Sequence, residues 1–120
     1  MKIRMIINNE EFTATMYDNP SAKDFISLLP LTLTLEDYAG TEKVSTLPKK
    51  LSLKDAPAGC DPSVGDITYY SPWGTLAIFY RDFGYARGLV RLGRIDSMAQ
   101  FMKSCGDSCV IKIEKMAPGR

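Results

Sequence analysis

The segment from Tyr69 to Arg94 is the part of this 120-residue chain whose residue types could do chemistry. It holds seven aromatic residues and four arginines but no lysine. A guanidinium group presents a planar set of donors and also stacks on aromatic rings, so this mixture suits recognition of peptide carbonyls, carboxylates or bases. We therefore interpret the segment as a candidate ligand-binding surface.

Alternation along one predicted strand of this segment separates two faces. Leu76 and Ile78 lie on one face of the strand, and Phe79 and Arg81 lie on the other. If the aliphatic face is the core, the second face forms an outer groove. The predicted ligand-binding residues are Tyr70, Trp73, Phe79, Arg81, Tyr85 and Arg94, and Arg81 is also the candidate catalytic residue.

Two other interpretations of the same residues stay open. The aromatic side chains could pack beneath the long loop 36–65, with the arginines as surface charges. They could also form a platform for nucleic acid, but 15 Lys plus Arg against 14 Asp plus Glu, a net charge of +1, gives no global field toward a polyanion. We therefore expect no nucleic-acid and no membrane partner.

Several reaction classes lack their residues. The chain has no histidine, which removes Ser-His-Asp and Cys-His catalysis and His-ligated metal sites. There is no phosphate-loop string, and the glycines at 84, 88 and 93 do not form a dinucleotide-binding pattern. We expect neither a metal nor another cofactor.

Cysteine usage and the opening residues predict a cytoplasmic protein. Three cysteines form no even framework, so we interpret them as structural thiols; the alternative is a Cys105–Cys109 disulfide, if the two Cα atoms come within bridging distance. The opening residues break into polar ones before a signal-peptide apolar region forms, and no stretch approaches the ~20 apolar residues of a membrane span.

Apolar periodicity predicts the elements of the first half. Alternation over 2–7 and 12–17 predicts a β-hairpin, and Asn19-Pro20 starts a short helix that Pro30 ends. Residues 31–35 alternate as a strand. From 36 to 65 the pattern is lost, which predicts either a functional loop or a packed crossover at the end of a barrel.

The second half continues with strands. Residues 66–70 and 75–81 flank a tight turn, and 89–95 form a strand in which Gly93 indicates a bulge or a close backbone approach. Ser97 to Gln100 reads as a capping box that opens a helix ending at Gly106, before a last strand over 109–115.

This inventory of about seven or eight strands and two short helices predicts a mainly β fold, a closed barrel capped by the helices, because closure removes exposed sheet edges. We assign residues 1–115 to a single barrel domain and residues 116–120 to a frayed end.

The string Gly65-Asp66-Ile67-Thr68-Tyr69-Tyr70-Ser71-Pro72-Trp73-Gly74-Thr75-Leu76-Ala77-Ile78-Phe79-Tyr80 closely resembles small bacterial and archaeal proteins with a cyclophilin-like fold, a family of uncharacterised function. The opening hairpin and the strand 31–35 extend the resemblance over almost the whole chain. The second half also resembles true cyclophilins, the proline isomerases. The resemblance implies an eight-stranded barrel closed by two helices.

The resemblance implies less about activity. Cyclophilins bind prolyl peptides on the outside of the barrel and use an arginine at the isomerising amide, with a histidine at the start of the strand that matches 89–95. Leu89 stands at that histidine position, and the Phe-His-Arg pattern has no match in 44–65. Arg81 is the residue that could supply a guanidinium to the same surface.

We therefore predict a cyclophilin-like module that binds a small molecule or a proline-containing peptide in the aromatic and arginine groove. The alternative is a weak or atypical peptidyl-prolyl isomerase, with Arg81 or Arg94 as the donor to the amide. Isomerisation needs only loss of amide resonance, so such a donor and an apolar seat could suffice without acid, base or metal.

Overall fold

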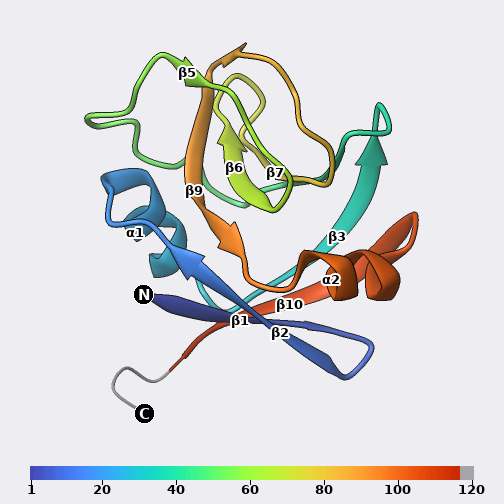
Figure 1. Cartoon of the computed structure of the whole chain (residues 1–120). Coiled ribbons are helices and arrows are strands. Elements are labelled where there is room, and N and C mark those ends of the chain that lie inside the picture. The colour runs from blue at the N-terminus through green and yellow to red at the C-terminus, as the bar shows by residue number, and fades with distance from the viewer. Residues whose placement is uncertain (117–120) are drawn as a thin grey trace.

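The structure is a computed structural model that describes residues 1–116. Eight antiparallel strands close into a barrel in the order β1-β10-β3-β4-β7-β6-β9-β2 (Figure 1). Their bounds are β1 Lys2–Ile7, β2 Glu10–Met16, β3 Leu31–Tyr38, β4 Glu42–Thr46, β6 Asp66–Tyr70, β7 Thr75–Phe79, β9 Leu89–Ile95 and β10 Ser108–Lys115. The predicted closed, mainly β barrel is confirmed.

A separate two-stranded sheet joins β5 (Gly59–Cys60) to β8 (Ala86–Arg87) beside the barrel. The barrel itself begins with the predicted hairpin of β1 and β2. Asn8 and Asn9 at its turn have φ of 50° and 70°, the left-handed conformation that a two-residue hairpin turn requires and that asparagine tolerates. Of the predicted frayed end, residues 117–120 lie outside the described part of the chain.

Two helices pack against the barrel, on opposite sides in the view of Figure 1. In α1 (Pro20–Ser27) the side chain of Asn19 accepts a hydrogen bond from the Ala22 amide at 2.8 Å, which confirms the predicted cap. In α2 (Met98–Cys105) the predicted capping box is wrong, because the Ser97 side chain makes no cap hydrogen bond. Neither described helix is long and apolar enough to cross a membrane.

The barrel interior is one hydrophobic core, to which both helices contribute. Leu76, Ile78 and Tyr69 are buried inside it, with Phe25 from α1 and Phe101 from α2. The side chains that alternate with Leu76 and Ile78 point outward, as strand geometry requires. Gly93 was predicted to mark a bulge or a close backbone approach, and both are present: the register between β6 and β9 shifts next to it, and a Cβ atom there would lie 2.5 Å from the Thr15 carbonyl oxygen.

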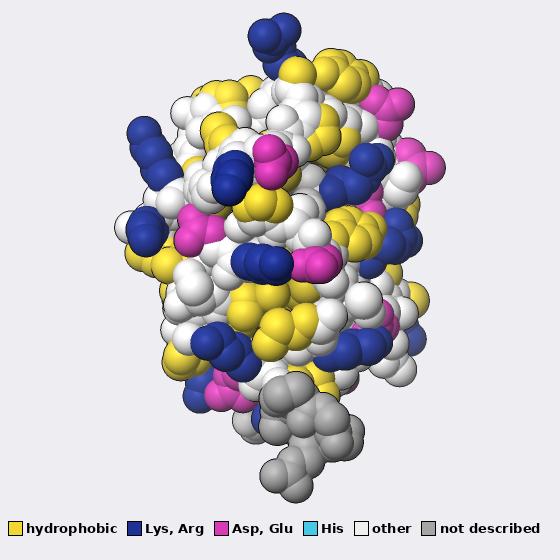
Figure 2. Space-filling view, turned by 90° about the vertical axis from the view of Figure 1, so that its left-hand side faces the viewer, with side chains coloured by type: hydrophobic (Ala, Val, Ile, Leu, Met, Phe, Trp, Pro, Cys, Tyr) yellow, Lys and Arg dark blue, Asp and Glu magenta, His cyan; other side chains and the backbone are white. Residues whose placement is uncertain are grey.

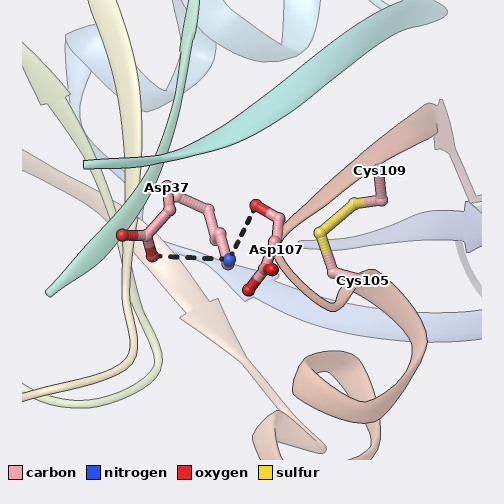
Figure 3. Close-up of a disulfide and its surroundings, with 5 residues drawn as sticks. Asp37, Cys105, Asp107 and Cys109 are labelled. Atoms are coloured by element: carbon pink, nitrogen blue, oxygen red, sulfur yellow. Dashed lines mark hydrogen bonds and ion pairs between the residues drawn. A yellow bond between two sulfur atoms is a disulfide. The ribbon is translucent and has the colours of Figure 1, made fainter. Parts of the chain in front are cut away.

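The prediction of an irregular segment from residue 36 onward is wrong for its first part. β3 runs on to Tyr38, and β4 pairs with both β3 and β7. The alternation is hidden because the inward position between Glu42 and Val44 is a lysine. Lys43 is only 2% exposed, and its Nζ donates to the Asp107 carbonyl at 3.0 Å (Figure 3).

The interpretation of all three cysteines as unpaired thiols is wrong for two of them. Cys105 at the end of α2 and Cys109 in β10 form a disulfide, with Cα atoms 4.9 Å apart (Figure 3). Gly106, with φ of 63°, turns the chain between them and brings the two residues within bridging distance. Cys60 is free and buried.

Candidate ligand-binding pocket

A pocket of about 240 Å³ opens on the outer wall of the barrel, over β4, β7, β6 and β9. Strand alternation creates it, because residues out of step with the core-facing side chains stand on this wall. The lining residues are Tyr38, Glu42, Val44, Tyr70, Trp73, Thr75, Ala77, Phe79, Phe83, Ala86 and Leu89. Most of them are apolar or aromatic, which is the composition of small-molecule sites.

The floor of the pocket is a second apolar cluster, distinct from the barrel core. Ala77, Phe79 and Leu89 are at most 2% exposed, and half-buried Val44 and Tyr70 pack against them. Buried side chains of this kind do not shift easily, since their rotamers are fixed by close packing. The floor is therefore preformed.

Aromatic rings form the walls. The Trp73 ring lies edge-on to Tyr38 at 5.6 Å and edge-on to Tyr70 at 5.2 Å between ring centroids. Across the pocket lining, Phe79 and Phe83 lie 6.3 Å apart. Trp73 and Phe83 nevertheless remain 58% and 49% exposed. The walls thus combine fixed ring contacts with faces open to solvent.

Glu42 is the one charged side chain among the described residues that line the pocket. It pairs across the sheet with Tyr38 on β3 and with Phe79 on β7, so its two strand neighbours are both lining aromatics. Its carboxylate accepts a long hydrogen bond, 3.4 Å, from the Thr41 hydroxyl. Burial, with a smaller contribution from the charge of Asp37, raises the pKa of Glu42.

Three of the six predicted site residues come together in this pocket. Tyr70 and Trp73 stand at one side and Phe79 forms part of the floor. The strand register places Tyr70, and not its neighbour Tyr69, on the outer wall. Tyr69 points into the barrel, where its hydroxyl accepts a hydrogen bond from the Leu51 amide at 3.2 Å.

The other three predicted residues do not line the pocket. Arg81 donates through Nε to the Gly40 carbonyl at 3.0 Å. Arg94 donates to Asp66 at 2.8 Å, and Tyr85 packs against the backbone of Gly59. The guanidinium groups thus serve local structure: Asp66 is 1% exposed and accepts from both Arg91 and Arg94.

Sequence reasoning missed Tyr38, Glu42 and Phe83. The first two belong to the hairpin of β3 and β4 that the sequence pattern hid. Phe83 follows β7 in the aromatic segment. Its closeness to Phe79 in the sequence was the signal that could have placed it in the pocket, where the two rings lie near each other. A prediction of β4 would have placed Glu42 next to Phe79.

The fold and the pocket define a class: an eight-stranded antiparallel barrel with two packed helices and an apolar recess on its outer wall. Family comparison makes this specific. The model of the cyclophilin-like family matches residues 5–114, so the chain belongs to that family, as the resemblance predicted.

A solved structure shares the fold. The solution structure of a hypothetical protein from Archaeoglobus fulgidus aligns with a TM-score of 0.67 and 18% sequence identity, over 97% of this chain and 95% of that chain. No curated protein is significantly similar to this chain.

Proposed function

We propose that the protein is a cyclophilin-like binding module whose outer pocket holds a small molecule or the side chain of an extended, proline-containing peptide. The observation that carries this proposal is Trp73, a large apolar ring that is 58% exposed yet held edge-on by Tyr38 and Tyr70 beside a buried floor. Exposed aromatic surface at a preformed recess is typical of recognition sites. A ligand would gain affinity by covering it.

A recess of about 240 Å³ suits a small molecule or one side chain of a longer molecule. The net charge of +1 favours a ligand of neither sign at long range. Figure 2 shows basic and acidic side chains interspersed on one face of the molecule. Recognition therefore rests on contacts within the pocket.

The alternative function, weak prolyl isomerisation with Arg81 or Arg94 as amide donor, has less support. Arg81 is engaged by the Gly40 carbonyl and lies 5.9 Å from the centroid of the Tyr80 ring, and Arg94 is engaged by Asp66 and Val64. A cis/trans exchange assay on a short X-Pro peptide, with wild type and Arg81→Ala, separates the two functions. Acceleration by wild type that Arg81→Ala abolishes would favour the isomerase.

The binding test screens a small-molecule library and a set of X-Pro peptides by tryptophan fluorescence. Trp73 is the only tryptophan and lines the pocket, so its fluorescence reports on binding there. Compounds that change the fluorescence are retested with Phe83→Ala, which opens one wall. Tyr85→Ala is the matched control, an exposed aromatic outside the pocket lining.

We expect affinity to fall about tenfold in Phe83→Ala, since burying a Phe side chain is worth about 1.5–3 kcal/mol, and to stay within twofold in Tyr85→Ala. Equal effects of the two substitutions would contradict the proposal. The cytoplasmic location expected from the sequence stays a prediction.

A further inference from the structure

We infer that the ligand of this pocket is a cation, an alkylammonium group seated against the aromatic rings with Glu42 as its counter-ion. This inference rests on the proposed binding function and names the chemical class of the ligand.

The charges that line and border the pocket favour a positive ligand. Glu42 carries the only formal charge among the described lining residues, and none of the described lysines or arginines forms an ion pair with it. The nearest cation along the chain, Lys43, points to the other side of β4. It is held there by the Asp107 carbonyl and by Asp37 at 3.4 Å.

The arginines near the pocket are also occupied or turned away. Arg81 reaches the Gly40 carbonyl and lies over the Tyr80 ring. Arg87 follows the lining residue Ala86 but is exposed and does not line the pocket. No described lysine or arginine therefore occupies the position beside Glu42, and a positively charged ligand can bind there.

The rings supply a second, independent attraction for a cation. The face of an aromatic ring carries negative potential, so a positive group within about 6 Å of ring centroids is stabilised. Tyr38 and Phe79 flank Glu42 across the sheet, and Trp73 lies edge-on to Tyr38. A neutral apolar ligand would use the rings but would leave the half-buried carboxylate with no partner of opposite charge and with the long hydrogen bond from the Thr41 hydroxyl, which costs free energy.

An alkylammonium group fits both demands. It places apolar methyl or methylene groups against the rings and a positive charge near the carboxylate. The group can come from a free small molecule or from a lysine side chain of a peptide, and the two sources share this head group.

The test compares choline with 3,3-dimethylbutan-1-ol, which has the same shape but no charge, by titration of Trp73 fluorescence. We expect choline to bind about tenfold more tightly, within the range that cation–π contacts support. Equal or weaker binding of choline would overturn the inference but leave the proposed pocket intact. Failure of both probes to bind would overturn the inference and count against the proposed function.

Two variants separate the carboxylate from the rings. Glu42→Gln should weaken choline binding about fivefold and change binding of the neutral alcohol less than twofold. Glu10→Gln removes the same charge from an exposed site on β2 and should change neither. Loss of selectivity for choline in Glu10→Gln as well would refute the assigned role of Glu42.

A last comparison separates the two sources. Binding of a short peptide that contains trimethyllysine is compared with binding of choline. It is also compared with binding of a control peptide in which uncharged norleucine replaces trimethyllysine. Tighter binding of the trimethyllysine peptide than of choline identifies a peptide ligand, and the reverse identifies a free amine. Selectivity for the norleucine peptide would contradict the inference for both sources.

Discussion

The Nζ atom of Lys43 lies 3.0 Å from the carbonyl oxygen of Asp107, inside the turn that the Cys105–Cys109 disulfide closes. One buried side chain on β4 thus holds the connection between α2 and β10. The disulfide holds the same connection covalently. Two unrelated interactions therefore fix one end of the barrel (Figure 3).

Reduction of the disulfide should lower the free energy of unfolding. The bridged residues are separated by 4 positions, and a loop of this size is worth about 2 kcal/mol in the chain-entropy description. We expect a loss of about that size when urea unfolding is measured with and without reductant. In Cys105→Ser/Cys109→Ser the reductant should have no effect, and a thiol titration of the denatured wild type should find Cys60 alone. Equal stability in both conditions would contradict this prediction.

Gly93 should not tolerate a side chain. A Cβ atom there would lie 2.5 Å from the Thr15 carbonyl oxygen and 2.7 Å from the Met16 sulfur, closer than real contacts allow. Gly93→Ala should lower the free energy of unfolding by about 1–3 kcal/mol, the usual cost of overpacking. Gly84→Ala is the control, because nothing lies within 4 Å of its added Cβ. Thermal or urea unfolding of both variants measures the difference.

Asp96 should stabilise the protein in a pH-dependent way. Burial alone would raise the pKa of Asp96, but hydrogen bonds from Lys2, Thr13 and Thr15 outweigh it and hold the pKa below the usual 3.8. The folded state is therefore favoured above the unfolded-state pKa of about 4, and the gain is lost as the pH falls through the lower folded pKa.

Asp96→Asn should lower the free energy of unfolding by about 1 kcal/mol at pH 7, in line with charge-assisted hydrogen bonds at a partly exposed site. The difference from wild type should shrink below about pH 4. Asp55→Asn, at an exposed site, should change little at any pH. A pH-independent difference for Asp96→Asn would show that its charge is not the cause.

Glu42 should cost stability at neutral pH. Because burial raises its pKa above the ordinary 4.5, the ionised carboxylate is less favourable in the folded chain than in the unfolded chain. Stability is therefore lost as the pH rises from the ordinary value through the folded pKa.

Glu42→Gln should recover this cost. Solvent screening limits the gain at pH 7 to no more than about 0.5 kcal/mol, and the gain should vanish below about pH 4. Urea unfolding at pH 7 and pH 3.5 measures it. A loss of stability at pH 7 would contradict the prediction and would give Glu42 a structural role.

The sequence predicted the barrel because its core strands alternate cleanly, as Leu76 and Ile78 show. It also predicted Tyr70, Trp73 and Phe79 as neighbours, since a tight turn joins the two strands that carry them. These predictions needed only local periodicity. They required no knowledge of which distant segments pair.

The rest of the pocket depended on long-range pairing. A lysine at an inward position hid β4, so Glu42 could not be placed beside Phe79. The arginines were assigned to the groove by composition. Arg94 is in fact held by buried Asp66, the residue opposite it on the neighbouring strand β6. Residue type alone does not show whether a guanidinium is free or already bound.

Glu42 and Lys43 are adjacent residues with opposite charges that the pleat of β4 sends to opposite sides of the barrel wall. The register of β4 against β3 and β7 therefore determines whether the pocket carries a negative or a positive charge. A one-residue shift of β4 that moved Glu42 into the place of Lys43 would turn the Lys43 ammonium group into the recess. It would also bury the Glu42 carboxylate where the Asp107 carbonyl now accepts a hydrogen bond. The register that buries Lys43 at one end of the barrel therefore also places a carboxylate in the outer recess.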